Sequence, residues 1–334
     1  MDSKLIFFGF IYLFLLGDVI RAGGSQQIEA FSSFELEAIQ KIKPGEILTA
    51  KGGLMDFERG ISSETCFLAA HPLEKVSERI IFWDQTPYAD LGIFIQGKLS
   101  SEGEPDFSKL SFIPSLRPVA KFMDKTRDTR AHDSPLHLST SEATMIAAKQ
   151  GSLDVSLMNQ LWSSILSGRF SSYQSGGLKA LSSFDACKTA VQVVGEVDAI
   201  LAEQLGVAKE FKDLFEKIKT TPTDGAHYWQ LQNVDGTAVL VLGTVYKNEL
   251  ANGGVQLIDL QWYVTSGYYT AFTCYELHPL EMGRTAATLI WRGDFTSISM
   301  KQMRKGVERM FSVNVMIQEV KKSIRFFLED LGKK

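Results

Sequence analysis

The sequence of 334 residues predicts an α+β fold, in which an antiparallel β-sheet is covered by a long C-terminal helix. Two patterns carry this prediction. Between residues 226 and 297, segments rich in β-branched and aromatic residues follow one another with short glycine-containing turns, which is typical of an antiparallel meander. From there to residue 331, apolar residues recur every three or four positions, which is typical of an amphipathic helix.

The first residues are typical of a secretory signal peptide. An apolar stretch from Leu5 to Leu16 is followed by small residues suited to cleavage after Ala22 or Gly24. This stretch is shorter than the about 20 residues that a membrane-spanning helix needs. We therefore expect residues 1–24 to be removed and residues 25–334 to form one exported domain, periplasmic or secreted. An uncleaved N-terminal anchor is the alternative.

Composition and charge limit the class of protein. Hydrophobic residues make up 45% of the chain and charged residues 22%, as in ordinary globular proteins. The formal net charge of −4 argues against a nucleic-acid partner, which favours a basic balance. Cys66, Cys187 and Cys274 are odd in number, so at most one disulfide is possible. Because Cys66 and Cys274 lie in strand-like segments, we expect buried free thiols instead.

The stretch from Ile61 to Ile80 predicts a strand that leads directly into a short helix. Strand-like residues continue to Ala69, and Pro72 then suits a first helical turn, where its missing N–H would have no partner anyway. Apolar residues follow at helical spacing. With its neighbours, this stretch predicts that residues 46–100 contribute the first part of the sheet.

Residues 139–220 predict a helical insertion between the two parts of the sheet. Ser139 or Ser141, with Glu142 close behind, is typical of a helix N-terminus. Asp154 is suited to cap a second helix, and two further helices are expected before the insertion ends.

Two segments predict looser structure. Prolines punctuate residues 114–135, which indicates an extended or irregular chain before the insertion. The Gly/Ser-rich stretch 168–177 predicts a flexible connector within the insertion.

Within the meander, apolar and polar residues alternate. Ile258, Leu260 and Trp262 are apolar, whereas Asp259 and Gln261 between them are polar. A period of two predicts that one face of the sheet meets water and the other is covered. We expect the C-terminal helix, over about 300–331, to supply the cover.

The order of these elements resembles the helix-grip fold of START-type lipid-transfer domains, pollen allergens and polyketide-cyclase-like (SRPBCC) proteins. In those proteins the first strand ends in a phrase such as A-x-P-x-x-V, and "AAHPLEKV" from Ala69 to Val76 stands in that place. The resemblance covers residues 46–100 and 226–331, and the insertion is longer than the usual connection. The arrangement also resembles a group of exported bacterial proteins without a known activity.

The helix-grip resemblance implies a cavity between the curved sheet and the helix, suited to an apolar small molecule or lipid. A packed core is the alternative, because apolar stripes usually fill space. Asn314 interrupts the apolar stripe of the helix, where it would either point a polar group into the pocket or, as is more common, cap a backbone carbonyl or meet water at the edge. The expected lining residues are Trp262, Phe272, Trp291, Met310, Phe311, Asn314 and Ile317.

Other sequence patterns do not indicate a catalytic, metal or phosphate-binding site. His132, Asp133 and His137 are metal-ligand types, but their spacing in a Pro-broken segment indicates a solvated loop, so no metal is predicted. His71 and His278 each precede a proline at the end of a strand and are expected to be structural. The chain has no supported nucleophile motif and no phosphate-binding glycine loop. No catalytic residue or cofactor is therefore predicted.

The resulting hypothesis is an exported, non-enzymatic binding or carrier protein for an apolar small molecule or lipid. A hydrolase or cyclase in the same cavity is the alternative, and it needs at least two convergent polar groups. A third possibility is a structural or interaction protein whose core is filled. Basic residues around "KKSIR" in the C-terminal helix predict a solvated face, with peripheral contact to an anionic membrane as the alternative.

Overall fold

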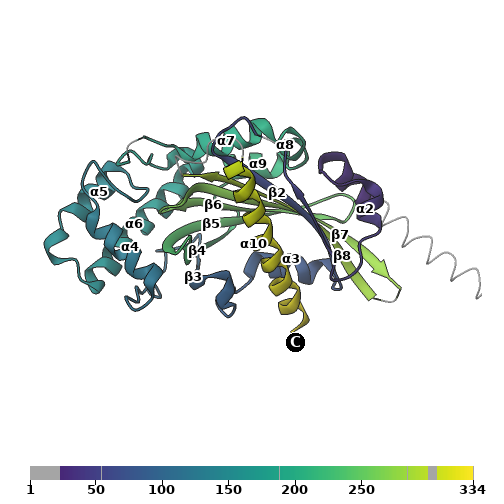
Figure 1. Cartoon of the computed structure of the whole chain (residues 1–334), viewed down its shortest axis with the longest axis horizontal. Coiled ribbons are helices and arrows are strands. Elements are labelled where there is room, and N and C mark those ends of the chain that lie inside the picture. The colour runs from purple at the N-terminus through teal and green to yellow at the C-terminus, as the bar shows by residue number, and fades with distance from the viewer. Residues whose placement is uncertain (1–22, 54, 188, 284, 300–306, 334) are drawn as a thin grey trace, which may run out of the picture.

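The structure is a computed structural model that describes residues 23–53, 55–187, 189–283, 285–299 and 307–333. The predicted signal peptide lies outside these residues, apart from Gly23 and Gly24. The fold is α+β, and its sheet has eight antiparallel strands in the order β1-β2-β8-β7-β6-β5-β4-β3 (Figure 1). The strands are β1 (Ile47–Lys51), β2 (Gly60–Ala69), β3 (Ile93–Leu99), β4 (Ala226–Val234), β5 (Thr237–Glu249), β6 (Val255–Val264), β7 (Tyr268–Met282) and β8 (Thr285–Ile298).

The predicted meander is confirmed, because β4 to β8 pair in sequence order through short turns. Asp235 and Gly236 join β4 to β5 with φ values of 49° and 73°. Positive φ at both central residues is the geometry of a hairpin turn whose twist matches that of the strands. The earlier strands then add at both ends, with β2 beside β8 and β3 beside β4.

One face of the sheet carries two helices, α3 (Leu73–Phe82) and α10 (Val307–Gly332), and α10 runs across the strands (Figure 1). This confirms the predicted C-terminal helix, although residues 300–306 lie outside the described chain. Apolar side chains of both helices pack on alternate strand residues such as Phe67, Leu257 and Ile290. This contact is the smaller of the two main cores.

The opposite face is covered by the helical insertion and by the residues just after Gly23. Its core is the larger one and includes Trp229, Trp262 and Trp291 from the strands. The expectation that α10 covers the apolar face of the meander is therefore wrong, because the insertion does so. The helices of this layer are α4 (Arg117–Asp128), α5 (Thr140–Ala147), α6 (Val155–Gly176), α7 (Val193–Glu203), α8 (Leu205–Glu210) and α9 (Lys212–Thr220).

The two segments predicted to be loose are largely helical. Residues 117–128 form α4, and residues 168–177 lie almost entirely within α6. The tertiary structure overrides the local Gly/Ser composition, because Arg169, Phe170 and Tyr173 are buried side chains on that part of α6.

The predicted caps of the insertion are confirmed. Ser139 and Glu142 form a reciprocal capping box at α5, and Asp154 accepts a hydrogen bond from the backbone of Leu157 at α6. Arg169 also reaches Glu142, donating to both carboxylate oxygens at 2.6 Å. The capping carboxylate thus also forms a buried ion pair that ties α6 to α5.

The strand-to-helix joint positions α3 against the end of α10. Thr288 Oγ1 on β8 donates to the backbone oxygen of His71 at 2.8 Å, which fixes the chain where it leaves the sheet. Two side chains of α3 then hold α10, because Lys75 Nζ donates to Leu331 O at 2.7 Å and Arg79 pairs with Asp330 at 3.0 Å. The joint predicted from the sequence therefore anchors the C-terminal helix.

The three thiols are free, and Cys66 and Cys274 are buried as expected, whereas Cys187 is partly exposed. Among the helices that the structure describes, none combines the length and apolar character required to cross a membrane.

Candidate functional site

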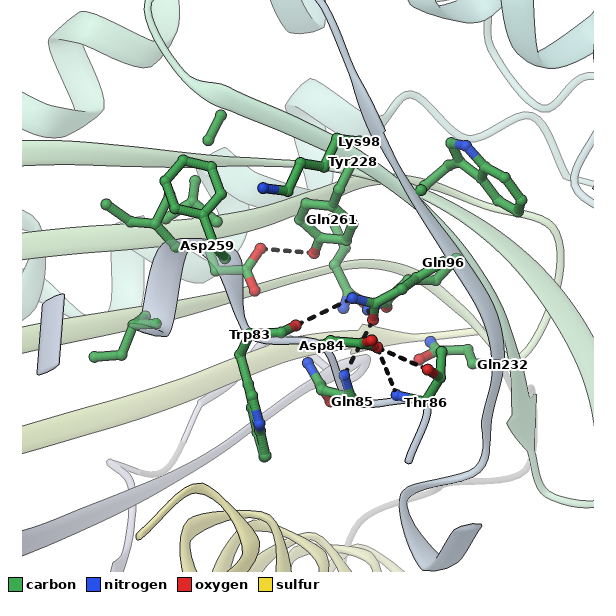
Figure 2. Close-up of a pocket in the computed structure, with 18 of the residues that line it drawn as sticks. Trp83, Asp84, Gln85, Thr86, Gln96, Lys98, Tyr228, Gln232, Asp259 and Gln261 are labelled. Carbon is green, nitrogen blue, oxygen red and sulfur yellow. Dashed lines mark hydrogen bonds between the residues drawn. The ribbon is translucent and has the colours of Figure 1, made fainter. Parts of the chain in front are cut away.

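A cavity of about 750 Å³ lies on the face of the sheet that carries α3 and α10. The strands from β2 to β8 form its floor, the end of α3 and residues 83–86 form one wall, and α10 forms another (Figure 2). From α10 the lining side chains are Ser323, Ile324 and Phe327. The cavity is open to solvent on part of its boundary.

Its floor is polar because the hydrophilic residues of the meander point to this face. Asp259 on β6 is directly paired with Thr273 on β7, and Thr273 is paired with Asp294 on β8. Such cross-strand partners lie side by side on one face of the sheet. The predicted alternation is confirmed here, but its polar residues face a cavity beneath α10 and not bulk water alone.

Tyr228 connects two strands that are not neighbours. It stands on β4, yet its hydroxyl donates to Asp259 Oδ1 on β6 at 2.7 Å, across the intervening β5 (Figure 2). Gly243 on β5 makes this possible, because a Cβ at that position would lie 2.4 Å from Cζ of the Tyr228 ring. A glycine inside a strand commonly marks such a close approach.

Asp259 is a carboxyl group of the floor whose pKa differs clearly from its ordinary value. Burial raises its pKa to about 6, against the opposing effects of the Tyr228 hydrogen bond and the Arg292 charge. Arg292 does not pair with it directly, because its Nε and Nη2 donate to Asp294 at 2.9 and 2.6 Å. Thr273 also donates to Asp294, at 3.0 Å.

Amide groups extend the polar floor. Gln232 Nε2 donates to the Tyr268 hydroxyl at 2.7 Å, and that hydroxyl donates to Gln261 Oε1 at 2.5 Å. At the wall, Gln96 Nε2 donates to the backbone oxygen of Trp83 at 3.1 Å (Figure 2). These bonds hold the amides in fixed orientations, which favours recognition of a polar group by a prepared surface.

The remaining walls combine polar residues with a group of apolar side chains. Lys98 stands at the rim with its Nζ 4.1 Å from the centre of the Phe82 ring, so its charge meets an aromatic face. Near Asp259, Val245 is its direct neighbour on β5. The apolar lining residues are Phe67, Ile80, Ile81, Phe82, Trp83, Phe94, Ile95, Ala226, Trp229, Val245, Ile324 and Phe327.

The three aromatic strand residues predicted to line a pocket do not line this one. Trp262 is stacked on Tyr173 of α6 with ring centres 4.2 Å apart, and its indole donates to a threonine hydroxyl. Phe272 and Trp291 are likewise buried in the core beneath the insertion. The reason is the period of two, which places them on the face opposite Asp259.

The predicted residues of the helix lie outside the cavity as well. Asn314 is exposed and Ile317 is half-buried on α10, and neither belongs to the lining. The side chains of Met310 and Phe311 lie outside the described part of the chain. The helix contributes through Ser323, Ile324 and Phe327, nearer its C-terminal end.

Sequence reasoning missed Asp259, Gln261 and Tyr228 as site residues. The signal for the first two was present, since both had been recognised as the polar members of an alternating strand. Their interpretation as a water-exposed face failed because α3 and α10 enclose part of that face. Tyr228 had no local signal, because its role depends on a glycine in the next strand.

His71, His137 and His278 do not line the cavity. His137 is buried and its Nδ1 lies 2.8 Å from Val264 O, and no group of residues suited to a metal ion is found in the described ranges. His278 lies 3.0 Å from Glu276, but on the face of the insertion. His71 holds the joint through its backbone.

The comparisons with known proteins leave the family open. No protein-family model matches the chain, and no curated protein matches it significantly.

Proposed function

We propose that this protein binds or carries a small lipid-like molecule in the cavity between the sheet and α10. The single observation that carries the proposal is the cavity itself, about 750 Å³, in which a hydrogen-bonded polar floor lies beside apolar side chains of α3, β3 and α10. Volumes of roughly 300–1,000 Å³ are typical of small-molecule sites. The ligand that fits this lining is amphipathic, with an apolar body and a polar head.

The fold and the location belong to the same proposal. The strand-to-helix joint, the meander and α10 support a helix-grip type of fold, in which the insertion is an added layer. The signal-like N-terminus supports export, so the ligand would be met outside the cytoplasm. Contact of the basic residues of α10 with an anionic membrane surface stays a prediction.

Native mass spectrometry after incubation with a membrane lipid extract tests the proposal. We expect a stoichiometric adduct on the wild-type protein. Ser323→Phe should weaken it, because the larger side chain on α10 projects into the cavity and takes up part of its volume. Arg325→Phe is the matched control, since Arg325 is exposed on the same helix, and it should keep the adduct. A wild-type protein that remains free of ligand in this experiment would contradict the carrier function.

A hydrolase or cyclase is the second candidate, favoured by one observation. Asp259 and Tyr228 are convergent polar groups in the cavity, and a carboxyl pKa of about 6 suits general acid–base chemistry near neutral pH. The same adduct decides between the two candidates. A carrier releases its ligand chemically unchanged, whereas an enzyme converts it, and Asp259→Asn would slow that conversion.

A further inference from the structure

We infer that the polar head of the bound molecule is an ammonium group, which Asp259 recognises at the bottom of the cavity. This inference rests on the proposed binding function and narrows it from lipid-like molecules to amphipathic amines.

The pairing of charges in the cavity is the first argument. Arg292 is satisfied by Asp294, and Lys98 lies over the ring of Phe82. Asp259, in contrast, has only the neutral Tyr228 hydroxyl as hydrogen-bond partner, and no salt bridge to it occurs among the described residues. Asp84, Asp106 and Lys109 also line the cavity, in loops away from the strand floor. Asp259 is thus the carboxyl group of the strand floor without an ion-pair partner among the described residues, and the Arg292 charge acts on it without a direct hydrogen bond.

The second argument is the position of the carboxyl group. Oδ1 accepts the hydrogen bond from Tyr228, and within the described chain Oδ2 has no such donor. Oε1 of Gln261 already accepts a hydrogen bond from the Tyr268 hydroxyl. Oδ2 of Asp259 is therefore the strong acceptor that the floor offers to a ligand. A charged donor suits this carboxylate better than a neutral one, because charge-assisted hydrogen bonds are shorter and about twice as strong as neutral ones.

The third argument is that Asp259 lies where the polar floor of the cavity meets apolar side chains. On β5 its neighbour is the apolar Val245, and two residues along β6 is Leu257, which belongs to the core under α3 and α10. Across the cavity, Ile324 and Phe327 of α10 add apolar surface. An amine bound to Asp259 can therefore place a hydrocarbon chain against these walls, whereas a fully polar cation would leave them exposed.

The carboxylate must be charged to bind the amine, which fixes the pH dependence. The groups that act on Asp259 are Tyr228 on β4, and Arg292 and Asp294 on β8, and the first two favour the charged form. Tyr275 on β7 keeps its proton, because burial raises its pKa. With a pKa of about 6 for Asp259, amine binding should strengthen as the pH rises through that value.

Isothermal titration with three probes of equal chain length tests the inference: n-octylammonium, n-octanol and n-octanoate. We expect octylammonium to bind the wild-type protein about 10- to 100-fold more tightly than octanol, as one charge-assisted hydrogen bond predicts. Octanoate should bind most weakly. The preference for the amine should shrink between about pH 8 and about pH 5, while the amine itself stays protonated, since alkylamines titrate near a pKa of about 10.

Asp259→Asn should make octylammonium and octanol bind equally. Asp106→Asn is the matched control, because Asp106 lines the rim of the same cavity but is exposed, and it should retain the preference. The pH series on the wild-type protein tests the inference without any substitution.

The outcomes separate the inference from the proposed function. If octanol binds as tightly as octylammonium to the wild type, or octanoate binds best, the ammonium inference is overturned and the carrier function stands. If no probe binds and no lipid adduct forms, the carrier function fails and the inference fails with it.

Discussion

At the scale of single residues, Asp259 and Trp262 show how far the sequence leads. Both stand on β6, and the alternation of polar and apolar residues correctly predicted that they point to different faces. The sequence could not show which face a helix encloses, because that depends on where distant elements pack. Trp262 was therefore assigned to the pocket and Asp259 to the surface, and the structure reverses both assignments.

The raised pKa of the half-buried Asp259 carboxyl leads to a prediction about stability. Its pKa is about 6 in the folded state against an ordinary value of 3.8, so the charged form is penalised by folding. This penalty appears as the pH rises through 3.8 and is complete above about 6. Asp259→Asn should therefore raise the free energy of unfolding by about 1–3 kcal/mol at about pH 8 and by much less at about pH 4. Urea unfolding at the two pH values measures this, and an equal effect at both would contradict it.

At the scale of elements, local patterns predicted the ends of helices better than their continuity. Ser139 and Asp154 cap α5 and α6 as expected, because a cap depends on neighbouring residues only. The Gly/Ser-rich part of α6 was predicted to be a flexible connector. Burial of Tyr173 against Trp262 and the Arg169–Glu142 pair stabilise the helix there, and both contacts join residues far apart in sequence.

A second prediction concerns Gly243 on strand β5. Gly243→Ala should push the Tyr228 ring away from Asp259 and destabilise the protein by about 1–3 kcal/mol, as overpacking usually does. The loss should be smaller in a Tyr228→Ala background, because the clash has been removed. Gly195→Ala in α7 is the matched control. Its Cβ would meet nothing within 4 Å, so this change should be neutral or stabilising in the same chemical unfolding experiment.

At the scale of the whole molecule, the sequence predicted the parts and not their layers. The segments of the sheet and the C-terminal helix lie where they were expected. The pairing of β2 with β8 joins residues more than two hundred positions apart, such as Cys66 and Trp291, and no local pattern encodes it. For the same reason, the sequence did not predict that the insertion, and not α10, covers the apolar face.

The thiols report on the unfolding of this whole layered structure. Burial raises the pKa of Cys66 and Cys274, which lie in β2 and β7 within the larger core. Both should react with a disulfide reagent at the rate of global opening, whereas the partly exposed Cys187 should react first. Peptide mapping after timed labelling measures the order. Early labelling of Cys66 would show that the layer over β2 opens independently.

The alternation of faces along β6 and β7 has a consequence for how this protein can diversify. Asp259, Gln261 and Thr273 form part of the cavity, while the residues between them belong to the core beneath the insertion. Substitutions at the first set change what is recognised and leave the packing of Trp262 and Phe272 intact. A combinatorial library restricted to alternate positions could therefore redirect the ligand preference of this sheet without redesigning the fold.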